Sequence, residues 1–365
     1  MRQKRPVNFD RFLLITVILA ALYGIIAIYS ATRSFDTNTN VIIQSVSMCI
    51  GIIVMVILTI FDYEQYELFL KPVGAVSIGL LLLVLIIGKS GDWGAQSWIR
   101  IGPIGIQPSE IAKIGFILTF SYHLNKVGEK INEPKNLLFL IIHLAVPVTL
   151  IMLQPDAGSA MVFIFIFIVM MFVAGVSLKY LLTATAAGII SLPLIYMFLL
   201  SDYQKHRIQV FLNPDLDKLG SGYNVIQSKI AVGSGGFFGK GFLQGTQNQL
   251  GFLPTKHTDF IFSVISEELG FIGASIVILL LFTIIFRCLK TASSSNTLFG
   301  KYICTGVAAM LIFHTVENIG MCIGLLPVTG IPLPFFSYGG SSLITNFIAI
   351  GLVLSVSYHN VRRKY

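Results

Sequence analysis

Residues 251–271, GFLPTKHTDFIFSVISEELGF, gather ionisable side chains at the start of a long uncharged stretch. Within them, Asp259 follows closely on Lys256 and His257, an arrangement in which a carboxylate can take a proton or orient a hydroxyl group. The alternative is a purely structural role for Asp259. An Asp in the first turn of a helix, after Thr258 as the N-cap, is stabilised by about 0.3–1 kcal/mol. These residues alone leave both interpretations open.

Two further polar groups occur at the edges of apolar stretches. In QPSEIAKIGF, residues 107–116, Glu110 and Lys113 are three residues apart and therefore share one face of a helix. In LQPDAGSAM, residues 153–161, Asp156 follows a proline. Ionisable residues inside a membrane are costly and usually face a partner or a cavity. The pair is thus either a salt bridge that fixes its helix or part of an outward-facing cavity, and helix capping alone could explain Asp156.

The stretch 313–343, FHTVENIGMCIGLLPVTGIPLPFFSYGGSSL, combines a polar helical turn with repeated proline and glycine. His314, Glu317 and Asn318 share the turn, but their spacing is not the HExxH of a zinc site. The prolines and glycines predict a re-entrant, non-helical segment that also contains Ser337. Such backbone occurs at membrane depth only when it is buried in protein or lines water. A structural plug is the alternative to a functional segment.

Residues 202–258 form a long connection with more basic than acidic side chains. Loops longer than about 12–15 residues are usually functional or disordered, and apolar residues at near-helical spacing here predict short helices in the membrane interface. The glycine-rich GSGGFFGKG, residues 233–241, could offer backbone N–H groups and Lys240 to an anion. A P-loop is absent, so a nucleotide triphosphatase is not favoured. An amphiphile with an anionic head group fits better.

The composition indicates a membrane protein. The chain has 365 residues, of which 55% are hydrophobic and 12% are charged, whereas ordinary soluble domains carry about 25% charged residues. The four cysteines show no CxxC spacing and are interpreted as small core residues. The net charge of +8 is explained by topology, because basic residues cluster in tails and turns. A nucleic-acid partner is therefore not expected.

Ten stretches are apolar enough to cross a bilayer as helices of about 20 residues. They are residues 11–31, 41–61, 68–88, 108–125, 136–154, 158–175, 179–200, 259–286, 299–324 and 341–360. The sequence thus predicts an all-α polytopic membrane protein, a single domain over residues 1–365, with ten transmembrane helices. A long extracellular loop, 202–258, lies between the seventh and eighth helices. The distribution of Lys and Arg predicts cytoplasmic termini by the positive-inside rule.

Four stretches together resemble the SEDS family of bacterial shape, elongation, division and sporulation proteins. They are QPSEIAK (107–113), QPDAGSA (154–160), GTQNQLGFLPTKHTDFIFSVISEELGF (245–271) and GLLPVTGIPLPFFSYGGSSL (324–343). The similarity follows nearly the whole chain in order, and it is greater to the elongation branch than to the division branch. The chain departs from the family pattern at Thr255, where glutamate is common, and at Phe336, where a smaller apolar residue is usual.

The resemblance implies a peptidoglycan glycosyltransferase of the bacterial plasma membrane. Such an enzyme polymerises lipid II on the outer face of the membrane, with a class B penicillin-binding protein as partner and membrane lipid around it. The resemblance also maps the family's essential loop aspartate onto Asp259. The Glu–Lys pair of the family's fourth helix maps onto Glu110 and Lys113, and its other outward aspartate maps onto Asp156.

An inverting displacement is consistent with these residues. A sugar hydroxyl of one lipid II attacks the anomeric carbon of a lipid-pyrophosphate-linked chain, while Asp259 takes the proton or orients the acceptor. Cations must neutralise the departing pyrophosphate. The basic candidates are Lys113, Arg100, Arg207 and Lys240, with Lys256, His257 and Ser337 as supporting residues. A divalent cation, Mg²⁺ or Mn²⁺, is kept as an alternative, although no ligand cluster in the sequence demands one.

Two other functions are consistent with the same residues. A transporter that flips lipid II could use the intramembrane Glu110–Lys113 pair and the broken segment for alternating access. It is less favoured because the polar residues concentrate on the predicted outer side. A non-catalytic scaffold for the penicillin-binding protein is the third alternative. A polymerisation assay with purified protein and lipid II separates all three.

Overall fold

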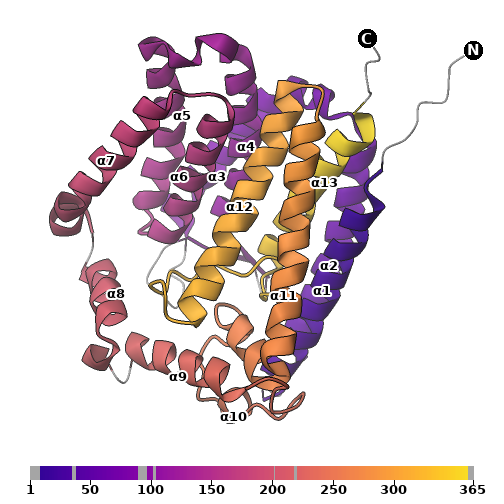
Figure 1. Ribbon diagram of the computed structural model, residues 1–365, viewed down its shortest axis with the longest axis vertical. Coiled ribbons are helices and arrows are strands. Elements are labelled where there is room, and N and C mark those ends of the chain that lie inside the picture. The colour runs from indigo at the N-terminus through magenta and orange to yellow at the C-terminus, as the bar shows by residue number, and fades with distance from the viewer. Residues whose placement is uncertain are drawn as a thin grey trace, which may run out of the picture.

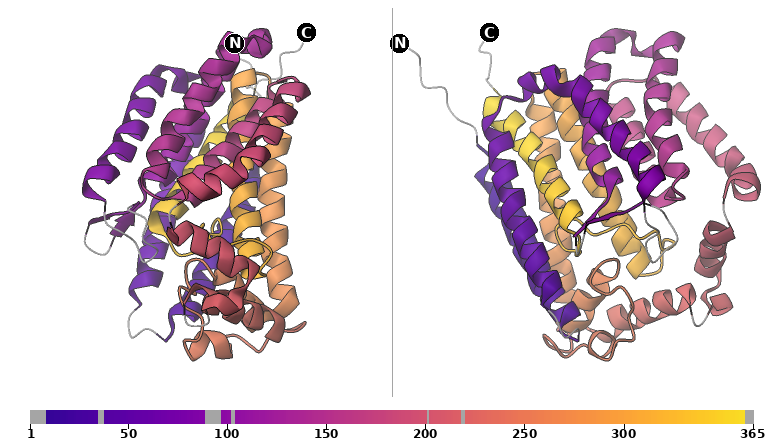
Figure 2. Two further views of the ribbon diagram at one scale, coloured as in Figure 1. Left: turned by 90° about the vertical axis from the view of Figure 1, so that its left-hand side faces the viewer. Right: turned by 180° about the vertical axis from the view of Figure 1, so that it is seen from behind.

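The computed structural model describes residues 9–34, 38–88, 97–101, 104–200, 202–217 and 220–360. Its helices form one elongated bundle (Figures 1 and 2). The first described helix begins, and the last one ends, on the same side of the bundle, where the rings of Phe9 and Tyr358 lie 6.4 Å apart. We call this side the terminal end and the opposite side, which carries α9 and α10, the loop end.

The long helices account for most of the described chain. They are α1 (Arg11–Thr32), α2 (Thr39–Ile60), α3 (Leu70–Ile87), α4 (Pro108–Val127), α5 (Pro134–Met152), α6 (Ala157–Val173), α7 (Leu178–Leu194), α11 (Ile261–Ser294), α12 (Leu298–Cys322) and α13 (Gly340–His359). Each apolar stretch predicted from the sequence coincides with one of them, with boundaries shifted by a few residues. Among the described residues, seven spans are long and apolar enough to cross a membrane: α1, α2, Tyr63–Ile87, α5, α11, α12 and α13.

Shorter elements connect the long helices. They are η1 (Tyr63–Phe69), the antiparallel strands β1 (Ile99–Ile101) and β2 (Ile104–Ile106), η2 (Gly128–Asn132), the π-helical turn η3 (Ile195–Leu199), α8 (Asp202–Leu212), η4 (Pro214–Asp217), α9 (Ser221–Ser234) and α10 (Thr246–Gln249). Figure 1 shows α7 leaning away from the central helices, after which α8 and α9 run around the loop end. The long connection predicted from the sequence therefore contains short helices.

Side-chain caps explain where several helices begin. Asp10 accepts a hydrogen bond from the backbone N–H of Leu13 (2.9 Å) at the start of α1, and Thr297 accepts one from Gly300 (3.1 Å) at the start of α12. Asp10 also forms an ion pair with Arg287 of α11, with 2.6 Å between Oδ2 and Nη2. This pair ties α1 to α11 at the terminal end.

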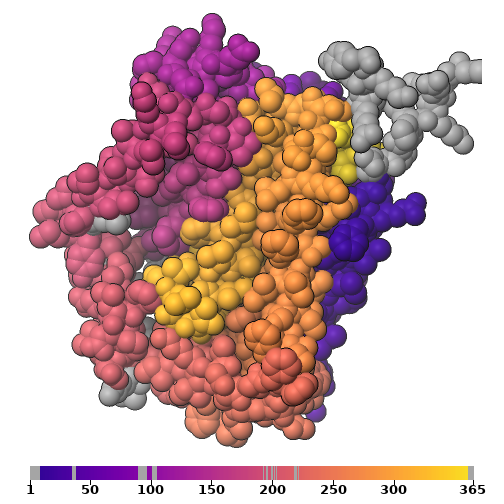
Figure 3. Space-filling model, viewed as in Figure 1, coloured from indigo at the N-terminus to yellow at the C-terminus, as the bar shows by residue number. Residues whose placement is uncertain are grey.

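The core lies around α12 and α13, which are mostly buried, whereas α2, α3 and α5 expose much of their apolar surface. Helix α12 packs against α11, α6, α4 and α13, and α13 packs mainly against α2. Between α12 and α13 the chain is not helical, and we call residues 323–339 the broken segment. It passes through the loop-end half of the bundle and reaches the surface between α8 and α11 (Figure 3). The predicted non-helical segment is thus present.

Helix α11 differs in its bounds and its regularity from the helix 259–286 predicted from the sequence. It begins at Ile261 and ends at Ser294, and Gly270 interrupts its regular backbone with φ +65°. A positive φ is a conformation that glycine adopts without steric cost. The helix starts slightly later than predicted because the chain makes a separate turn at Thr255–Phe260. The predicted N-cap was wrong, since Thr258 donates its hydroxyl to the carbonyl of Thr255 (3.1 Å) and does not cap the helix.

Residues 235–241, which we call the strap, fill the interruption in α11. They replace the missing helical hydrogen bonds with four bonds of their own. Lys240 N–H donates to Glu267 O (3.0 Å), Gly241 N–H to Glu268 O (3.0 Å), Phe271 N–H to Gly236 O (2.9 Å) and Ile272 N–H to Phe237 O (3.3 Å). A Cβ atom on Gly239 would lie 2.1 Å from Glu268 O. The glycines of GSGGFFGKG therefore permit a close backbone approach.

Candidate active site

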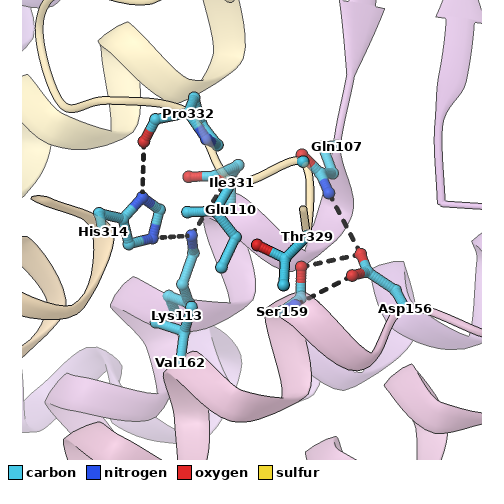
Figure 4. Close-up of a pocket in the computed structure, with 11 residues that line it drawn as sticks. Gln107, Glu110, Lys113, Asp156, Ser159, Val162, His314, Thr329, Ile331 and Pro332 are labelled. Atoms are coloured by element: carbon cyan, nitrogen blue, oxygen red, sulfur yellow. Dashed lines mark hydrogen bonds and ion pairs between the residues drawn. The ribbon is translucent and has the colours of Figure 1, made fainter. Parts of the chain in front are cut away.

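A small polar cavity lies in the loop-end half of the bundle, between α4, α6, α12 and the broken segment (Figure 4). Its lining residues are Gln107, Glu110, Lys113, Asp156, Ser159, Val162, His314, Thr329, Gly330, Ile331 and Pro332. The volume of this cavity is about 20 Å³. It holds a water-sized group and is far too small for a sugar.

Lys113 is the cation of this cavity and is almost fully buried, with 1% of its surface exposed. Its Nζ lies 2.7 Å from Glu110 Oε1, one turn earlier in α4, and 2.8 Å from His314 Nε2 on α12. The sequence predicted the pairing of Glu110 with Lys113 on one helical face. The histidine was noted but received no role, although a His in a polar turn of an apolar helix was a usable signal.

The other ring nitrogen of His314 identifies its tautomer. Nδ1 lies 3.2 Å from the carbonyl oxygen of Pro332, which can only accept a hydrogen bond. Nδ1 therefore carries the proton and donates, which leaves a lone pair on Nε2 to accept from the ammonium group of Lys113. The ring thus connects α4 to the broken segment.

Asp156 lies on the opposite side of the cavity and caps α6. It accepts from the backbone N–H (2.9 Å) and the hydroxyl (2.8 Å) of Ser159, and from Nε2 of Gln107 at 3.3 Å. The capping interpretation thus describes its geometry. The same carboxylate also lines the cavity, so capping and ligand binding are compatible roles for this residue.

One turn of α12 fastens the broken segment at the cavity. Glu317 accepts from the hydroxyl of Thr329 (2.7 Å), and Nδ2 of Asn318 donates to the carbonyl of Ile331 (2.8 Å). The same amide nitrogen donates to the carbonyl of Asp259 (2.9 Å). Asn318 is fully buried and holds two non-helical segments together.

Asp259 lies behind the broken segment, adjacent to the cavity. It precedes the first residue of α11 and is 6% exposed, so it is less displayed than the predicted first-turn position implied. Gly330, which lines the cavity with φ +78°, has no side chain, and a Cβ built on it would lie 3.8 Å from Asp259 Oδ2. Gly330 thus lines the cavity, and the space that its side chain would occupy borders the Asp259 carboxylate.

Three predicted supporting residues lie in or beside the turn that carries Asp259. Lys256 donates to the hydroxyl of Ser34 (2.8 Å) and to the carbonyl of Asn248, and burial lowers its pKa. Burial, followed by the positive charge of Lys256, lowers the pKa of His257 to about 4 and favours a neutral ring at pH 7. Ser337 donates to the carbonyl of Thr258 (2.6 Å).

Three predicted phosphate-binding cations do not line the cavity. Lys240 pairs with Glu267 (2.8 Å), Arg207 donates to the carbonyl of Val328 (3.0 Å), and Arg100 is exposed on β1. The predicted anion-binding role of the strap is also wrong for the amides of Lys240 and Gly241. These amides donate to backbone carbonyls of α11.

Glu267 and Glu268 form a second buried charge cluster, which the sequence did not resolve. Glu267 accepts from four donors: Lys240 Nζ (2.8 Å), Thr246 Oγ1 (3.1 Å), Gln247 N–H (2.9 Å) and Asn248 N–H (3.1 Å). Glu268 accepts from Ser30 Oγ (2.5 Å), Leu243 N–H (3.2 Å), Asn248 Nδ2 (2.7 Å) and Gln249 Nε2 (3.2 Å). These carboxylates anchor α10 and its flanks.

No group of three or more His, Cys, Asp or Glu residues in the described part of the chain is arranged to hold a metal ion. Mg²⁺ commonly takes only one or two protein carboxylates and completes its coordination with water and substrate phosphates. Asp259 offers one such carboxylate. The described residues therefore do not form a complete protein cage, and they could hold a cation only together with a phosphorylated substrate.

Helices long and apolar enough to cross a membrane, packed around a buried ion pair beside a polar cavity, are typical of a multi-pass membrane protein. The chain belongs to the FtsW/RodA/SpoVE family, described as cell cycle proteins, whose sequence model matches residues 10–362. It is 36% identical to the peptidoglycan glycosyltransferase MrdB of Escherichia coli K12, over 97% of this chain and 94% of that protein. It is 34% identical to the peptidoglycan glycosyltransferase RodA of Treponema pallidum, over 98% and 99%.

Two solved structures share the fold. A chain of a peptidoglycan synthase complex, described as coordinating polymerization and crosslinking, has a TM-score of 0.84 and 32% identity, covering 97% of this chain and 99% of that one. The rod shape determining protein RodA of Thermus thermophilus has a TM-score of 0.73 and 30% identity, covering 96% and 97%. The fold is therefore RodA-like.

Proposed function

We propose that the chain is a membrane-embedded peptidoglycan glycosyltransferase that polymerises lipid II into glycan strands during cell elongation. The observation that carries the proposal is the junction at Gly330, where a polar cavity containing the Lys113–Glu110 pair meets the Asp259 carboxylate. A cation in the cavity and a carboxylate beside its wall suit a reaction that moves a proton and releases an anion. The names of the relatives support the same activity.

The proposed topology places this site on the outer face of the bacterial plasma membrane. All ten long helices cross the bilayer, with α4, α6 and α7 joining the seven spans that are both long and apolar enough on their own. Together they form a single membrane domain. The excess of Lys and Arg at the terminal end supports cytoplasmic termini. The loop end, with residues 202–258 at the membrane interface, then faces outward, where α8, α9 and α10 contact lipid head groups.

Asp259 acts as the base. The proton of the attacking sugar hydroxyl passes to its carboxylate, the hydroxyl oxygen forms the new glycosidic bond at the anomeric carbon, and the bond from that carbon to pyrophosphate breaks. The electron pair leaves with the lipid pyrophosphate. Because pyrophosphate is a good leaving group, no second carboxylic acid is needed, unlike in glycoside hydrolases.

Lys113 neutralises the charge that develops on the leaving pyrophosphate, and Glu110 holds it in place. Asp156 and Gln107 complete the polar wall on the far side of the cavity. The resting space of about 20 Å³ is too small for a sugar. Substrate therefore reaches Asp259 only when the broken segment shifts from its position against α4 and α6.

A divalent cation, Mg²⁺ or Mn²⁺, is part of the proposal. Asp259 is the residue that would hold it, together with substrate phosphates. When bound, such a cation adds positive charge beside the leaving pyrophosphate. The remaining chemistry belongs to the side chains already named.

A class B penicillin-binding protein is the proposed partner. The support is the similarity to a chain of a peptidoglycan synthase complex that coordinates polymerization with crosslinking. The partner would crosslink the strands that this chain polymerises. Lipid flipping and a purely scaffolding role remain the rival functions, and neither produces polymer from lipid II.

Asp259→Asn tests the proposal. Purified protein in liposomes, with lipid II and the partner, should make glycan polymer, and the Asn variant should lose at least about 100-fold in rate, within the range for a general base. Asp202→Asn, an exposed carboxylate on α8 at the same end, is the matched control and should retain the wild-type rate. Polymer formation by the Asp259 variant at the control rate would refute the assignment.

A further inference from the structure

The ammonium group of Lys113 is held by two acceptors on different helices. An ammonium group has three N–H donors. One donates to Glu110 Oε1 at 2.7 Å and another to His314 Nε2 at 2.8 Å. Figure 4 shows Lys113 between these residues, at the edge of the cavity. With two directions fixed, the tetrahedral geometry of nitrogen also fixes the direction of the third N–H.

His314 accepts from Lys113 only in one state. The carbonyl of Pro332 takes the Nδ1 proton, and the resulting neutral ring presents a lone pair at Nε2. A protonated ring, or the opposite tautomer, would present an N–H to the ammonium group and repel it. The ring is 2% exposed and its two nitrogens have different neighbours, so its orientation is defined from both sides.

We propose that His314 is a positioning residue that aims the remaining N–H of Lys113 at a pyrophosphate oxygen of the donor lipid. This inference rests on the proposed glycosyltransferase function and assigns His314 no contact with substrate. Glu110 supplies the countercharge, and His314 supplies the second fixed point that a flexible lysine side chain needs. Without that point the ammonium group rotates about its bond to Glu110, and the donor moves relative to the leaving group.

A simpler role for His314 must be separated from this one. The ring could act only as a strut that holds the broken segment through Pro332. The two roles use different nitrogens, so two amide side chains can separate them. Glutamine places its amide near the position of Nε2 and can accept from Lys113. Asparagine places its amide near Nδ1 and can donate to Pro332 but does not reach Lys113.

The experiment compares His314→Gln and His314→Asn as purified full-length proteins in liposomes with lipid II and the partner. The measurements are kcat, KM for lipid II and thermal unfolding temperature. The glutamine variant should stay within about threefold of wild type. The asparagine variant should lose about 10- to 100-fold in kcat, with KM within about twofold, because a misplaced group costs rate more than binding.

Each other outcome overturns the inference. Activity retained in the asparagine variant and lost in the glutamine variant assigns His314 to the broken segment. Equal activity in both variants leaves it no positioning role. Equal losses accompanied by equal falls in unfolding temperature make the residue structural. If the asparagine variant does not fold, a folded glutamine variant with a 100-fold loss is sufficient to reject the proposal.

The proposed function fails in a distinguishable way. If wild-type protein and both His314 variants make no polymer, while the partner is active in crosslinking, the glycosyltransferase assignment itself is wrong. A wild type that makes polymer, with variants that do not follow the expected order, removes only the role of His314. Inorganic pyrophosphate carries the negative charge that develops on the leaving group only as the bond breaks, so its binding reports on the position of the Lys113 ammonium group where KM for lipid II does not. It should raise the unfolding temperature of wild type and the glutamine variant more than that of the asparagine variant.

Discussion

Two groups of buried charge lie in the loop-end half of the bundle, and their hydrogen bonds differ. The carboxylates of Glu267 and Glu268 are surrounded by donors from the strap, α10 and α1. The Glu110–Lys113 pair has fewer partners, and both of its members line a cavity. Both groups sit on apolar helices with almost no exposed surface.

The difference teaches how to separate structural from functional charge in this fold. Burying a charge is costly, and full hydrogen bonding by fixed protein groups offsets that cost without any ligand. The carboxylates of Glu267 and Glu268 receive their hydrogen bonds from the protein itself, so we assign them the structural role of anchoring α10 and its flanks. A charged group that faces a polar cavity can still interact with a ligand that enters the cavity. The following substitutions test that distinction.

Lys113→Met should have the largest effect. It leaves Glu110 as an uncompensated buried charge, which destabilises by about 3–5 kcal/mol, and it removes the leaving-group cation, which lowers kcat by about 100-fold or more. Thermal unfolding and polymerisation rates measure the two effects. The double variant Glu110→Gln/Lys113→Met should recover most of the stability but not the rate. Recovery of rate in the double variant would make this pair structural, like the other cluster.

Glu267→Gln should have a large effect on stability and a small one on catalysis. The amide has one acceptor oxygen where the carboxylate accepts four hydrogen bonds, and its N–H groups meet donors such as Lys240. We expect a loss of about 3–5 kcal/mol, as for other broken buried pairs. The rate per folded molecule should fall by less than tenfold. A stable variant with a 100-fold lower rate would show that Glu267 has a functional role like that proposed for the Glu110–Lys113 pair.

Gly239→Ala should have the smallest effect of the series. The position has φ +82°, and a methyl group there would lie 2.1 Å from Glu268 O, so the strap must shift away from α11. We expect a loss of about 1–3 kcal/mol in unfolding measurements. Gly233→Ala is the control, because its methyl group would meet nothing within 4 Å and lies on α9. It should be neutral or stabilising, and equal losses at both positions would contradict a specific strap contact.

The sequence predicted the positions of the helices better than it predicted which side chains contact one another. Apolar length locates each long helix, because a bilayer-sized run of nonpolar residues has few other uses. Proline and glycine after Cys322 predicted the broken segment for the same local reason. Glu110 and Lys113 were paired correctly because both lie on one helix, three residues apart.

Contacts between distant residues could not be read from spacing. The glycines of the strap looked like an anion site, since a glycine-rich run with a lysine has the same local features. Its actual use depends on an interruption in α11 at Gly270, which only the folded chain reveals. His314 lies 201 positions from Lys113, so no local pattern could assign them to one another. The turn before α11 was missed because Thr258 and Asp259 also resemble a helix start.

Gly330 has no side chain, and this leaves open space between the cavity and the Asp259 carboxylate. Any larger residue there would project toward Asp259 Oδ2, 3.8 Å from where its Cβ begins, and would screen the carboxylate from the cavity. In the proposed mechanism, the absence of a side chain at Gly330 leaves the base open toward the cation once the broken segment has shifted to admit the sugar. A residue that transfers no proton and carries no charge would then decide whether the two reacting groups can meet.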